Sequence, residues 1–253
     1  MPQLAVPVSL VKHILSNASK AKHHKAKAHT IANLICIAFY YLLRVGEYTK
    51  QSGSKRKLTK PFRLRDITFR DSRGNLIPQT APLATLLTAA EATLRISNQK
   101  NSIKGQCIHQ QCTGTDDSPV KALARHVYHI LSNGGNANTY LYNYYKVPNH
   151  SKYVDQQQIN TAIKDAADKI GLHKLGYDRS DVSSHSLRAG GAMAMHLNGV
   201  PTNTIQKIGR WRSQTFLMYI HKQISALAAG VSLKMSNDIP FRHIAGPHLL
   251  DPT

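Results

Sequence analysis

The chain has 253 residues, which is enough for one large domain or two small ones with a hydrophobic core. Its apolar share of 42% is ordinary for a globular protein and excludes disorder as the default state. Lys and Arg number 33 against 13 Asp and Glu, so the formal net charge is +20. A compact domain with that much positive charge repels itself. This predicts an anionic partner, with nucleic acid favoured over an acidic membrane surface.

Three sequence features argue against a membrane-bound or secreted protein. The most apolar run, residues 31–45, is shorter than a bilayer span and contains Asn33 and two tyrosines. The N-terminus does not show the charged-then-apolar pattern and small-residue cleavage site of a signal peptide. The three cysteines are an odd and sparse set, which favours a reducing compartment over a disulfide framework. We therefore expect an intracellular protein that binds polyanions and does not bind membranes.

The first part of the chain predicts a long helix followed by a strand. A basic, His-rich stretch covers residues 20–29, after a short apolar segment. Across residues 29–48 apolar side chains recur at helical spacing, and residues 45–46 are the expected helix stop. Beyond a polar, basic loop, residues 64–70 alternate as a strand does, and residues 71–75 have the composition of a turn.

A hairpin and a second helix are predicted in the middle of the chain. Residues 92–97 and 106–110 bracket a polar segment, which is typical of a β-hairpin. Ser118 and Pro119 then open a helix that runs to about residue 133, with Ser as the cap and Pro in the first turn.

The last third of the chain is predicted to be helical. Asp155 caps a helix that runs to about residue 170. Residues 184–229 indicate further helices, broken at 199–201 and at Gly209. The expected fold class is therefore α+β, mainly helical with a small antiparallel sheet.

Two short motifs place arginines on helices. In the sequence LLRVGE, Arg44 lies at the end of the apolar helix and Glu47 follows three residues later. In the sequence HSLR, His185 and Arg188 are three residues apart and therefore on the same face of a helix. Each motif alone is weak, because an arginine can simply cap a helix C-terminus and an HxxR pair occurs by chance.

A third motif precedes a tyrosine. The sequence GRW, residues 209–211, contains the only tryptophan of the chain and is followed eight residues later by Tyr219. By default Trp211 would be a core residue, and Tyr219 is one of eleven tyrosines. Their order after the two arginine motifs is what distinguishes them.

The ordered set of an arginine, HxLR, GxW and a tyrosine resembles the tyrosine recombinase (phage integrase) family over roughly residues 30–221. The sequence NQKN at 98–101 with Gly105, and GRW at 209–211, most resemble recombinases of eukaryotic mobile elements. The resemblance implies that family's catalytic-domain fold for residues 30–221. It leaves a basic N-terminal segment, 1–29, and a C-terminal segment, 222–253, that docks on a neighbouring subunit.

The resemblance also implies the partners of the protein and its place in the cell. The partner is double-stranded DNA, on which the chain assembles as a homo-oligomer, a tetramer. No metal or other cofactor is required, and the protein is nuclear if its source is a eukaryote.

A reaction follows from the resemblance, and the chemistry of the residues agrees with it. Tyr219 would attack the phosphate, leaving a 3′-phosphotyrosine and a free 5′-hydroxyl. Arg44 and Arg188 would bind the non-bridging oxygens bidentately, which lysine does less well. His185 and Trp211 would complete that shell by hydrogen bonds. Because the covalent bond stores the energy of the phosphodiester, the reaction needs neither ATP nor a metal.

Two lysines compete for the role of general acid. Lys100, at the hairpin tip, would protonate the departing 5′-oxygen, and Lys104 lies close enough in sequence to take its place. Glu47 matches the acidic position after the first arginine and would orient its neighbours. The chain departs from the family in three respects. Trp211 replaces the more usual histidine, its distance to Tyr219 is one residue shorter, and no helical DNA-clamping domain is evident ahead of the catalytic domain.

Two other functions stay open at this point. A domesticated DNA-binding module that no longer cuts would keep the fold and the charge, but it would not need the full set of catalytic residues. A type IB topoisomerase shares the chemistry but relaxes supercoils alone, whereas a C-terminal segment long enough to dock on a neighbour favours recombination. A zinc site at Cys107, His109 and Cys112 is disfavoured, because the spacing matches no standard finger or ribbon.

Overall fold

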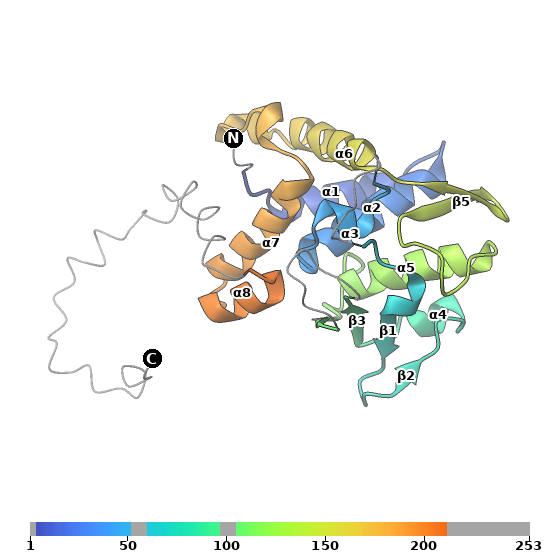
Figure 1. Ribbon diagram of the computed structural model, residues 1–253. Coiled ribbons are helices and arrows are strands. Elements are labelled where there is room, and N and C mark those ends of the chain that lie inside the picture. Colours follow the sequence, from blue (N-terminus) through green and yellow to red (C-terminus); the bar gives the residue numbers. More distant parts are fainter. Residues whose placement is uncertain (1–3, 52–59, 97–104, 212–253) are drawn as a thin grey trace, which may run out of the picture.

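The computed structural model describes residues 4–51, 60–96 and 105–211, in which helices predominate over a small antiparallel sheet (Figure 1). The helices are α1 (Val8–Ser19), α2 (Lys25–Tyr40), α3 (Val45–Tyr48), α4 (Leu83–Leu86), α5 (Pro119–Ser132), α6 (Gln156–Lys169), α7 (Ser184–Leu197) and α8 (Thr202–Gly209). The strands are β1 (Ile67–Arg70), β2 (Leu76–Ile77), β3 (Glu91–Arg95), β4 (Cys107–Gln111), β5 (Asn143–Val147) and β6 (His150–Tyr153). Short 3-10 helices are η1 (Leu64–Asp66), η2 (Leu172–Leu175) and η3 (Arg179–Asp181).

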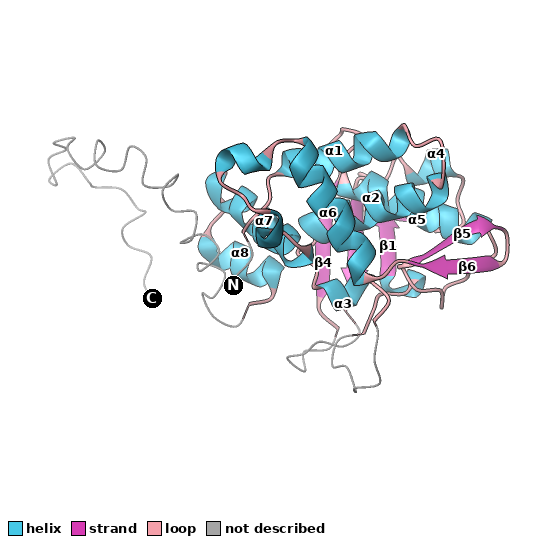
Figure 2. Cartoon of the chain, turned by 90° about the horizontal axis from the view of Figure 1, so that it is seen from above, coloured by secondary structure: helices cyan, strands magenta, loops and turns pink. Residues whose placement is uncertain are grey.

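Helix α2 is the centre of the hydrophobic core. It is buried along most of its length, with Leu34, Ile35 and Phe39 among its covered side chains. A helix that is apolar on all sides needs cover on all sides, and α1, α5, α6 and α7 supply it (Figure 2). Within the described ranges no helix, α2 included, has the length and apolar composition that crossing a bilayer requires.

Helix α1 packs on the same core, which the basic composition around it did not suggest. Leu10, Val11 and Ile14 are buried, and the helix packs against α2, α6 and α7. The residues before α1 are tied to the start of α7, because the Val6 amide donates to the Ser186 carbonyl oxygen at 3.3 Å. The described part of the N-terminal segment therefore shares one core with the residues that follow it.

The four-stranded sheet has the order β2-β1-β3-β4, and its strands pair antiparallel. The β3–β4 hairpin, with Leu94 opposite Ile108, confirms the predicted hairpin, although the tip, residues 97–104, lies outside the described residues. The Tyr41 hydroxyl donates to the Ala92 carbonyl oxygen at 2.8 Å. This buried bond ties the end of α2 to β3, so the hairpin is fixed relative to the turn that carries Arg44.

The described helices of the second half follow the sequence prediction closely, whereas the helices predicted beyond residue 211 lie outside the described residues. Helix α5 begins at Pro119, and α6 begins after Asp155, whose carboxylate accepts a hydrogen bond from the Gln158 amide at 2.9 Å. The chain breaks between α7 and α8 and again after Gly209, as expected. Strands β5 and β6 form a separate ribbon that projects from the body (Figures 1 and 2). The fold class, α+β and mainly helical with a small antiparallel sheet, is confirmed.

Two predicted elements are wrong in their bounds. The helix expected over 29–48 begins at Lys25 and ends at Tyr40, because Leu42 adopts a left-handed conformation that stops it. Arg44 therefore does not end the apolar helix but lies before the first residue of α3. The strand expected over 64–70 starts only at Ile67, because the preceding three residues form η1.

Candidate active site

The turn between α2 and α3 presents one backbone carbonyl to two arginines. Leu42 is buried and has a φ of 49°, a conformation that is rare for leucine because Cβ crowds the backbone. Arg188 Nη1 donates to the Leu42 carbonyl oxygen at 2.7 Å, and Arg210 Nη2 donates to the same oxygen at 3.0 Å. The turn thus gathers two side chains from distant segments beside Arg44.

Arg44 is held by its backbone and leaves its guanidinium partly exposed. Its amide donates to Glu47 Oε2 at 2.8 Å, which fixes the entry into α3. Its Nη1 lies 3.5 Å from Glu47 Oε1, and its side chain is 26% exposed. Burial lowers the pKa of Arg44, Glu47 opposes this shift and Arg210 adds to it. An arginine remains charged under such a shift, so Arg44 presents a cation at the surface of a buried network.

Helix α7 carries the two residues of the HSLR motif in different environments. Ser183 caps the helix, because its hydroxyl accepts a hydrogen bond from the His185 amide at 3.2 Å. His185 is exposed in the first turn of α7. Arg188, one turn later, is only 7% exposed. The helix thus places the histidine at the surface and the arginine inside the cluster.

Arg188 connects three segments of the chain. Besides its bond to Leu42, its Nη2 donates to the carbonyl oxygen of Gly209, the last residue of α8. Its Cζ lies 4.3 Å from the centroid of the Trp211 ring. A guanidinium fixed by two carbonyls and an aromatic face has little rotational freedom. Its position is therefore set before any ligand arrives.

Two glycines allow α7 to approach the end of α2 closely. A Cβ atom on Gly191 would collide with the Phe39 carbonyl oxygen and with Leu42 Cδ2. A Cβ on Gly190 would collide with the backbone of Val6. The pair follows Arg188 by two and three residues, so the close packing that it permits also brings Arg188 to the Leu42 carbonyl. The sequence carried this signal as an adjacent Gly pair inside a predicted helix.

Sequence reasoning missed Arg210, which pairs with Glu47. Arg210 Nη1 donates to Glu47 Oε1 at 2.8 Å and Nη2 donates to Oε2 at 3.0 Å. The two side chains are 1% and 2% exposed. Glu47 was predicted to orient its neighbours, and it contacts both Arg44 and Arg210. Nothing local marks Arg210, because its partner lies in a segment far away in the sequence.

The structure brings together part of the predicted site. Arg44, Glu47, Arg188 and Trp211 lie in one network around the turn at Leu42. Of the other predicted members, His185 is exposed in the first turn of α7, whereas Lys100, its alternative Lys104, and Tyr219 lie outside the described residues. Their roles stay predictions, as do the catalytic roles of the residues in the network.

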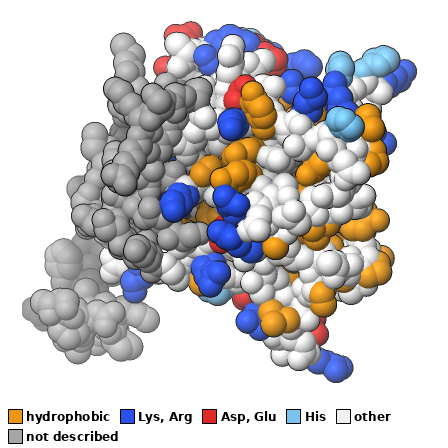
Figure 3. Space-filling view, turned by 45° about the vertical axis from the view of Figure 1, so that its right-hand side comes forward, with side chains coloured by type: hydrophobic (Ala, Val, Ile, Leu, Met, Phe, Trp, Pro, Cys, Tyr) orange, Lys and Arg blue, Asp and Glu red, His pale blue; other side chains and the backbone are white. Residues whose placement is uncertain are grey.

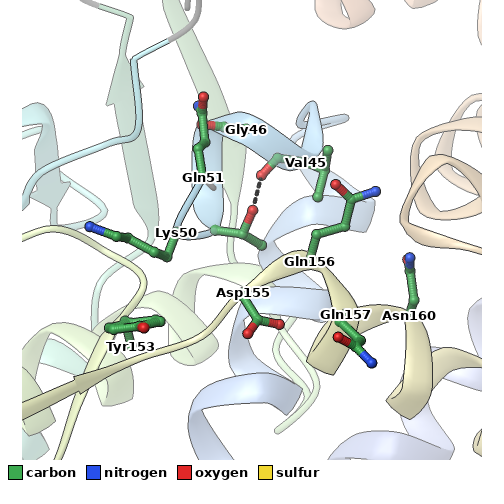
Figure 4. Close-up of a pocket in the computed structure, with 10 residues that line it drawn as sticks. Val45, Gly46, Lys50, Gln51, Tyr153, Asp155, Gln156, Gln157 and Asn160 are labelled. Atoms are coloured by element: carbon green, nitrogen blue, oxygen red, sulfur yellow. Dashed lines mark hydrogen bonds between the residues drawn. The ribbon is translucent and has the colours of Figure 1, made fainter. Parts of the chain in front are cut away.

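A cavity of about 810 Å³ lies on the outer side of α3. One wall consists of α3 and the residues just after it, including Gly46 and Lys50, and the other is the start of α6 with Gln156 and Gln157 (Figure 4). The Lys50 ammonium lies 5.6 Å from the centroid of the Tyr153 ring, which also borders the cavity. Eight of the ten lining residues are polar, and Val45, also in the lining, directly follows Arg44 in the sequence.

Positive charge is spread widely over the described surface. Figure 3 shows a face on which Lys and Arg side chains are more frequent than Asp and Glu. The connection between α1 and α2 exposes Lys20, Lys22 and Lys25. A surface with this excess of positive charge attracts a polyanion.

The candidate zinc residues have other contacts. His109 Nδ1 lies 2.9 Å from the Thr93 hydroxyl and 3.3 Å from Glu91 Oε1. Cys107 is exposed on β4, and Cys112 is half-buried just after that strand. In the part of the chain that the structure describes, no group of three metal-ligating side chains is found.

Comparisons with known proteins agree with the geometry. The sequence model described as the phage integrase family matches residues 84–225, more than half of the chain. No curated protein matches the sequence. Among solved structures, XerH site-specific recombinase in a post-cleavage complex with its palindromic difH substrate has a TM-score of 0.58 at 13% identity, covering 93% of this chain. XerA recombinase has a TM-score of 0.52 at 20% identity, covering 92% of this chain.

These structures belong to longer proteins. The chain spans 54% of the length of the XerH chain and 64% of the XerA chain. At such identities the likeness concerns the fold. The family match includes His185, Arg188 and Trp211 together with Lys100 and Tyr219, whereas Arg44 precedes it.

Proposed function

Because the chain belongs to the phage integrase family, we propose that it breaks and rejoins the strands of double-stranded DNA through a covalent bond to Tyr219. The observation that carries the proposal is the arrangement of Arg44, Arg188 and Trp211 around one turn. Arg188 is fixed by two carbonyls and an aromatic ring, and Arg44 is partly exposed beside it. Fixed cations suit a phosphodiester whose negative charge grows during the reaction.

In the proposed reaction, the phenolic oxygen of Tyr219 attacks phosphorus and the bond from phosphorus to the 5′-oxygen breaks. The unperturbed pKa of tyrosine is about 10, and guanidinium groups nearby favour the phenolate. Arg44 and Arg188 bind the non-bridging oxygens as they gain charge, and His185 and Trp211 add hydrogen bonds. Lys100 donates the proton that the departing 5′-oxygen needs.

Joining is the same chemistry in reverse. The 5′-hydroxyl of another strand attacks the phosphotyrosine, loses its proton, and releases Tyr219. Exchange between two duplexes requires several active sites, so the proposal includes a homo-oligomer, a tetramer, on DNA. It also includes an intracellular setting, nuclear in a eukaryotic source, where a mobile element would use such an enzyme.

A nicked suicide substrate tests the proposal. A nick close to the cleavage site lets the short 5′-product diffuse away, so that the covalent adduct accumulates. We expect an adduct with the unaltered chain and none with Tyr219→Phe, which should still bind DNA. Tyr153→Phe is the matched control, because Tyr153 is an exposed tyrosine beside the cavity and the proposal gives it no covalent role.

The other outcomes of that experiment are informative. DNA binding without any adduct would indicate a module that no longer cuts. An adduct accompanied by relaxation of supercoils, but without strand transfer between duplexes, would indicate topoisomerase activity. An adduct that persists in Tyr219→Phe would show that another tyrosine is the nucleophile.

A further inference from the structure

Arg210 is a buried cation to which the proposed reaction gives no role. Its side chain is 1% exposed, and its guanidinium makes three hydrogen bonds, two to the Glu47 carboxylate and one to the Leu42 carbonyl oxygen. A buried charge is tolerated only when it is paired and hydrogen-bonded. The side chain is thus built into the network around Arg44 and is not available to a ligand at the surface.

The backbone of Arg210 is also unusual. It has a φ of 58° and ends α8, at a point where glycine or asparagine is normally preferred. Leu42, to which it is bonded, has a φ of 49°. Two left-handed residues that are neither Gly nor Asn thus meet through one hydrogen bond. Unfavourable conformations of this kind persist only where the surrounding structure holds them, and they concentrate at functional sites.

Arg44 and Arg210 compete for one carboxylate. Arg210 contacts both oxygens of Glu47, at 2.8 and 3.0 Å, whereas the closest guanidinium contact of Arg44 is 3.5 Å. The bidentate pair is the stronger one. Glu47 therefore neutralises Arg210 in preference to Arg44, and the side chain of Arg44 stays 26% exposed.

We propose that Arg210 is a positioning residue for DNA cleavage that occupies Glu47 and so leaves the charge of Arg44 available to the scissile phosphate. Arg210 also donates to the Leu42 carbonyl oxygen, which accepts a second hydrogen bond from Arg188. One side chain therefore helps to position both Arg44 and Arg188. This role rests on the proposed function, because it concerns the same phosphate. Without Arg210, Glu47 would draw Arg44 into a bidentate pair of its own and away from the substrate.

Substitutions that replace the charged side chains with uncharged ones distinguish this role from one in which Arg210 only stabilises the fold. Arg210→Gln removes the positive charge at residue 210, so the Glu47 carboxylate is free to pair with the Arg44 guanidinium. The double variant Glu47→Gln with Arg210→Gln removes the competing carboxylate as well, and the loss of both buried charges together is better tolerated than the loss of one. Arg179→Gln is the matched control, because it removes one cation from an exposed pair with Asp165 and Asp168.

Cleavage is measured in a single turnover at saturating nicked DNA, with a normal scissile phosphate and with a methylphosphonate that lacks one negative charge. On the phosphate we expect Arg210→Gln to slow adduct formation by roughly 10²-fold, the usual cost of one lost transition-state contact, while the dissociation constant for DNA stays within about threefold. On the methylphosphonate the loss should shrink to under about tenfold, since Arg44 has less charge to stabilise. The double variant should regain at least about tenfold of the lost rate, and Arg179→Gln should match the unaltered chain.

Each result has a definite consequence. An equal loss on both substrates, or a double variant as slow as Arg210→Gln, would show that Arg210 only ties the fold together. If Arg210→Gln does not fold, the double variant is compared with the unaltered chain: a rate within about tenfold supports the role, and a loss of about 10²-fold overturns it. If the unaltered chain forms no adduct, the proposed function fails and this role fails with it. That outcome is distinct from an active enzyme whose Arg210 variant is equally slow on both substrates.

Discussion

Arg188 lies against the face of Trp211, with 4.3 Å between its Cζ and the ring centroid. The contact joins α7 to the residues after α8, and Arg188 also donates to the carbonyl oxygens of Leu42 and Gly209. Trp211 therefore has a definite place beside a catalytic candidate, as the motif order predicted. Whether its indole N–H binds phosphate stays a prediction.

Replacing Arg188 should affect the transition state more than DNA binding. Arg188→Ala should slow adduct formation by about 10²–10³-fold, because a preorganised cation opposite a growing charge is lost, and it should weaken DNA binding by less than about tenfold. Arg188→Lys keeps the charge but cannot reach both carbonyls and the ring at once, so it should also be slow. Equal losses in rate and affinity would demote Arg188 to a residue that only positions the phosphate.

Lys100 is predicted to be the general acid, and a sulfur substitution tests it. When sulfur replaces the bridging 5′-oxygen, the leaving group needs no proton. Lys100→Ala should therefore recover its cleavage rate on that substrate, whereas Arg188→Ala should not. Recovery by Lys104→Ala in place of Lys100→Ala would move the role to the second lysine.

The elements of the fold that could be predicted are those with a strong local signal. The hairpin, α5, α6 and the breaks around α8 follow from periodicity, caps and glycines near their ends. The end of α2 could not be predicted, because the apolar pattern continues through Leu42 and no helix-breaking residue marks the turn. Tertiary packing imposes the left-handed conformation there, on a residue type that disfavours it.

The same distinction applies to the site. The order of the motifs predicted Arg44, Glu47, Arg188 and Trp211, and the structure places these four in one network. Arg210 was missed because its importance depends on Glu47, which no local pattern connects to it. An interaction between distant segments becomes visible only when the chain is folded.

Gly191 should not tolerate a side chain. In Gly191→Ala the new methyl would meet the Phe39 carbonyl oxygen and Leu42 Cδ2, so α7 must move away from the turn. Overpacking of this kind typically costs about 1–3 kcal/mol, and the free energy of unfolding should fall by that amount in urea denaturation. Cleavage should slow as well, because Arg188 moves with α7. Leu197→Ala, on the exposed end of the same helix, should change the stability by less than about 0.5 kcal/mol.

Acid should destabilise the fold through His126. This histidine on α5 is buried, its Nε2 donates to the Leu141 carbonyl oxygen, and its Nδ1 has no partner. Burial lowers its pKa to about 4 from the ordinary value of 6.5. The unfolded chain therefore binds the proton more readily, so stability is fully present above about pH 6.5 and is lost as the pH falls toward 4. The pKa values of His29 and His129 are lowered too, with burial as the main cause.

Urea denaturation between pH 7 and pH 4 measures that loss. The His126 contribution should be on the order of 3 kcal/mol. His126→Gln keeps a donor for the Leu141 carbonyl but does not titrate, so its stability should fall less over the same range. His150→Gln, at an exposed position on β6, should retain the full pH dependence. An unchanged slope in His126→Gln would show that other groups cause the acid sensitivity.

DNA binding by this chain should depend strongly on salt and little on sequence. Its affinity is expected to come mostly from Lys and Arg contacts to phosphates, and each such contact makes the slope of log K against log salt more negative by about 0.9. Binding to a related element's end sequence and to random DNA should therefore weaken in parallel as salt rises. Tight, selective binding that survives raised salt would contradict this expectation.

One lysine localises the contact. Lys50 borders the cavity beside α3, so Lys50→Gln should make the slope less negative by roughly 0.9 and weaken binding to both DNAs alike. Lys25→Gln is the control, because Lys25 begins α2 and α2 has 16 residues, which places the lysine about 24 Å along the helix from the end next to Arg44. The slope of log K against log salt for Lys25→Gln should stay unchanged if the duplex lies across the candidate active site. Equal changes in the two variants would show that DNA contacts the whole basic surface, and a change in Lys25→Gln alone would place the duplex at the opposite end of α2.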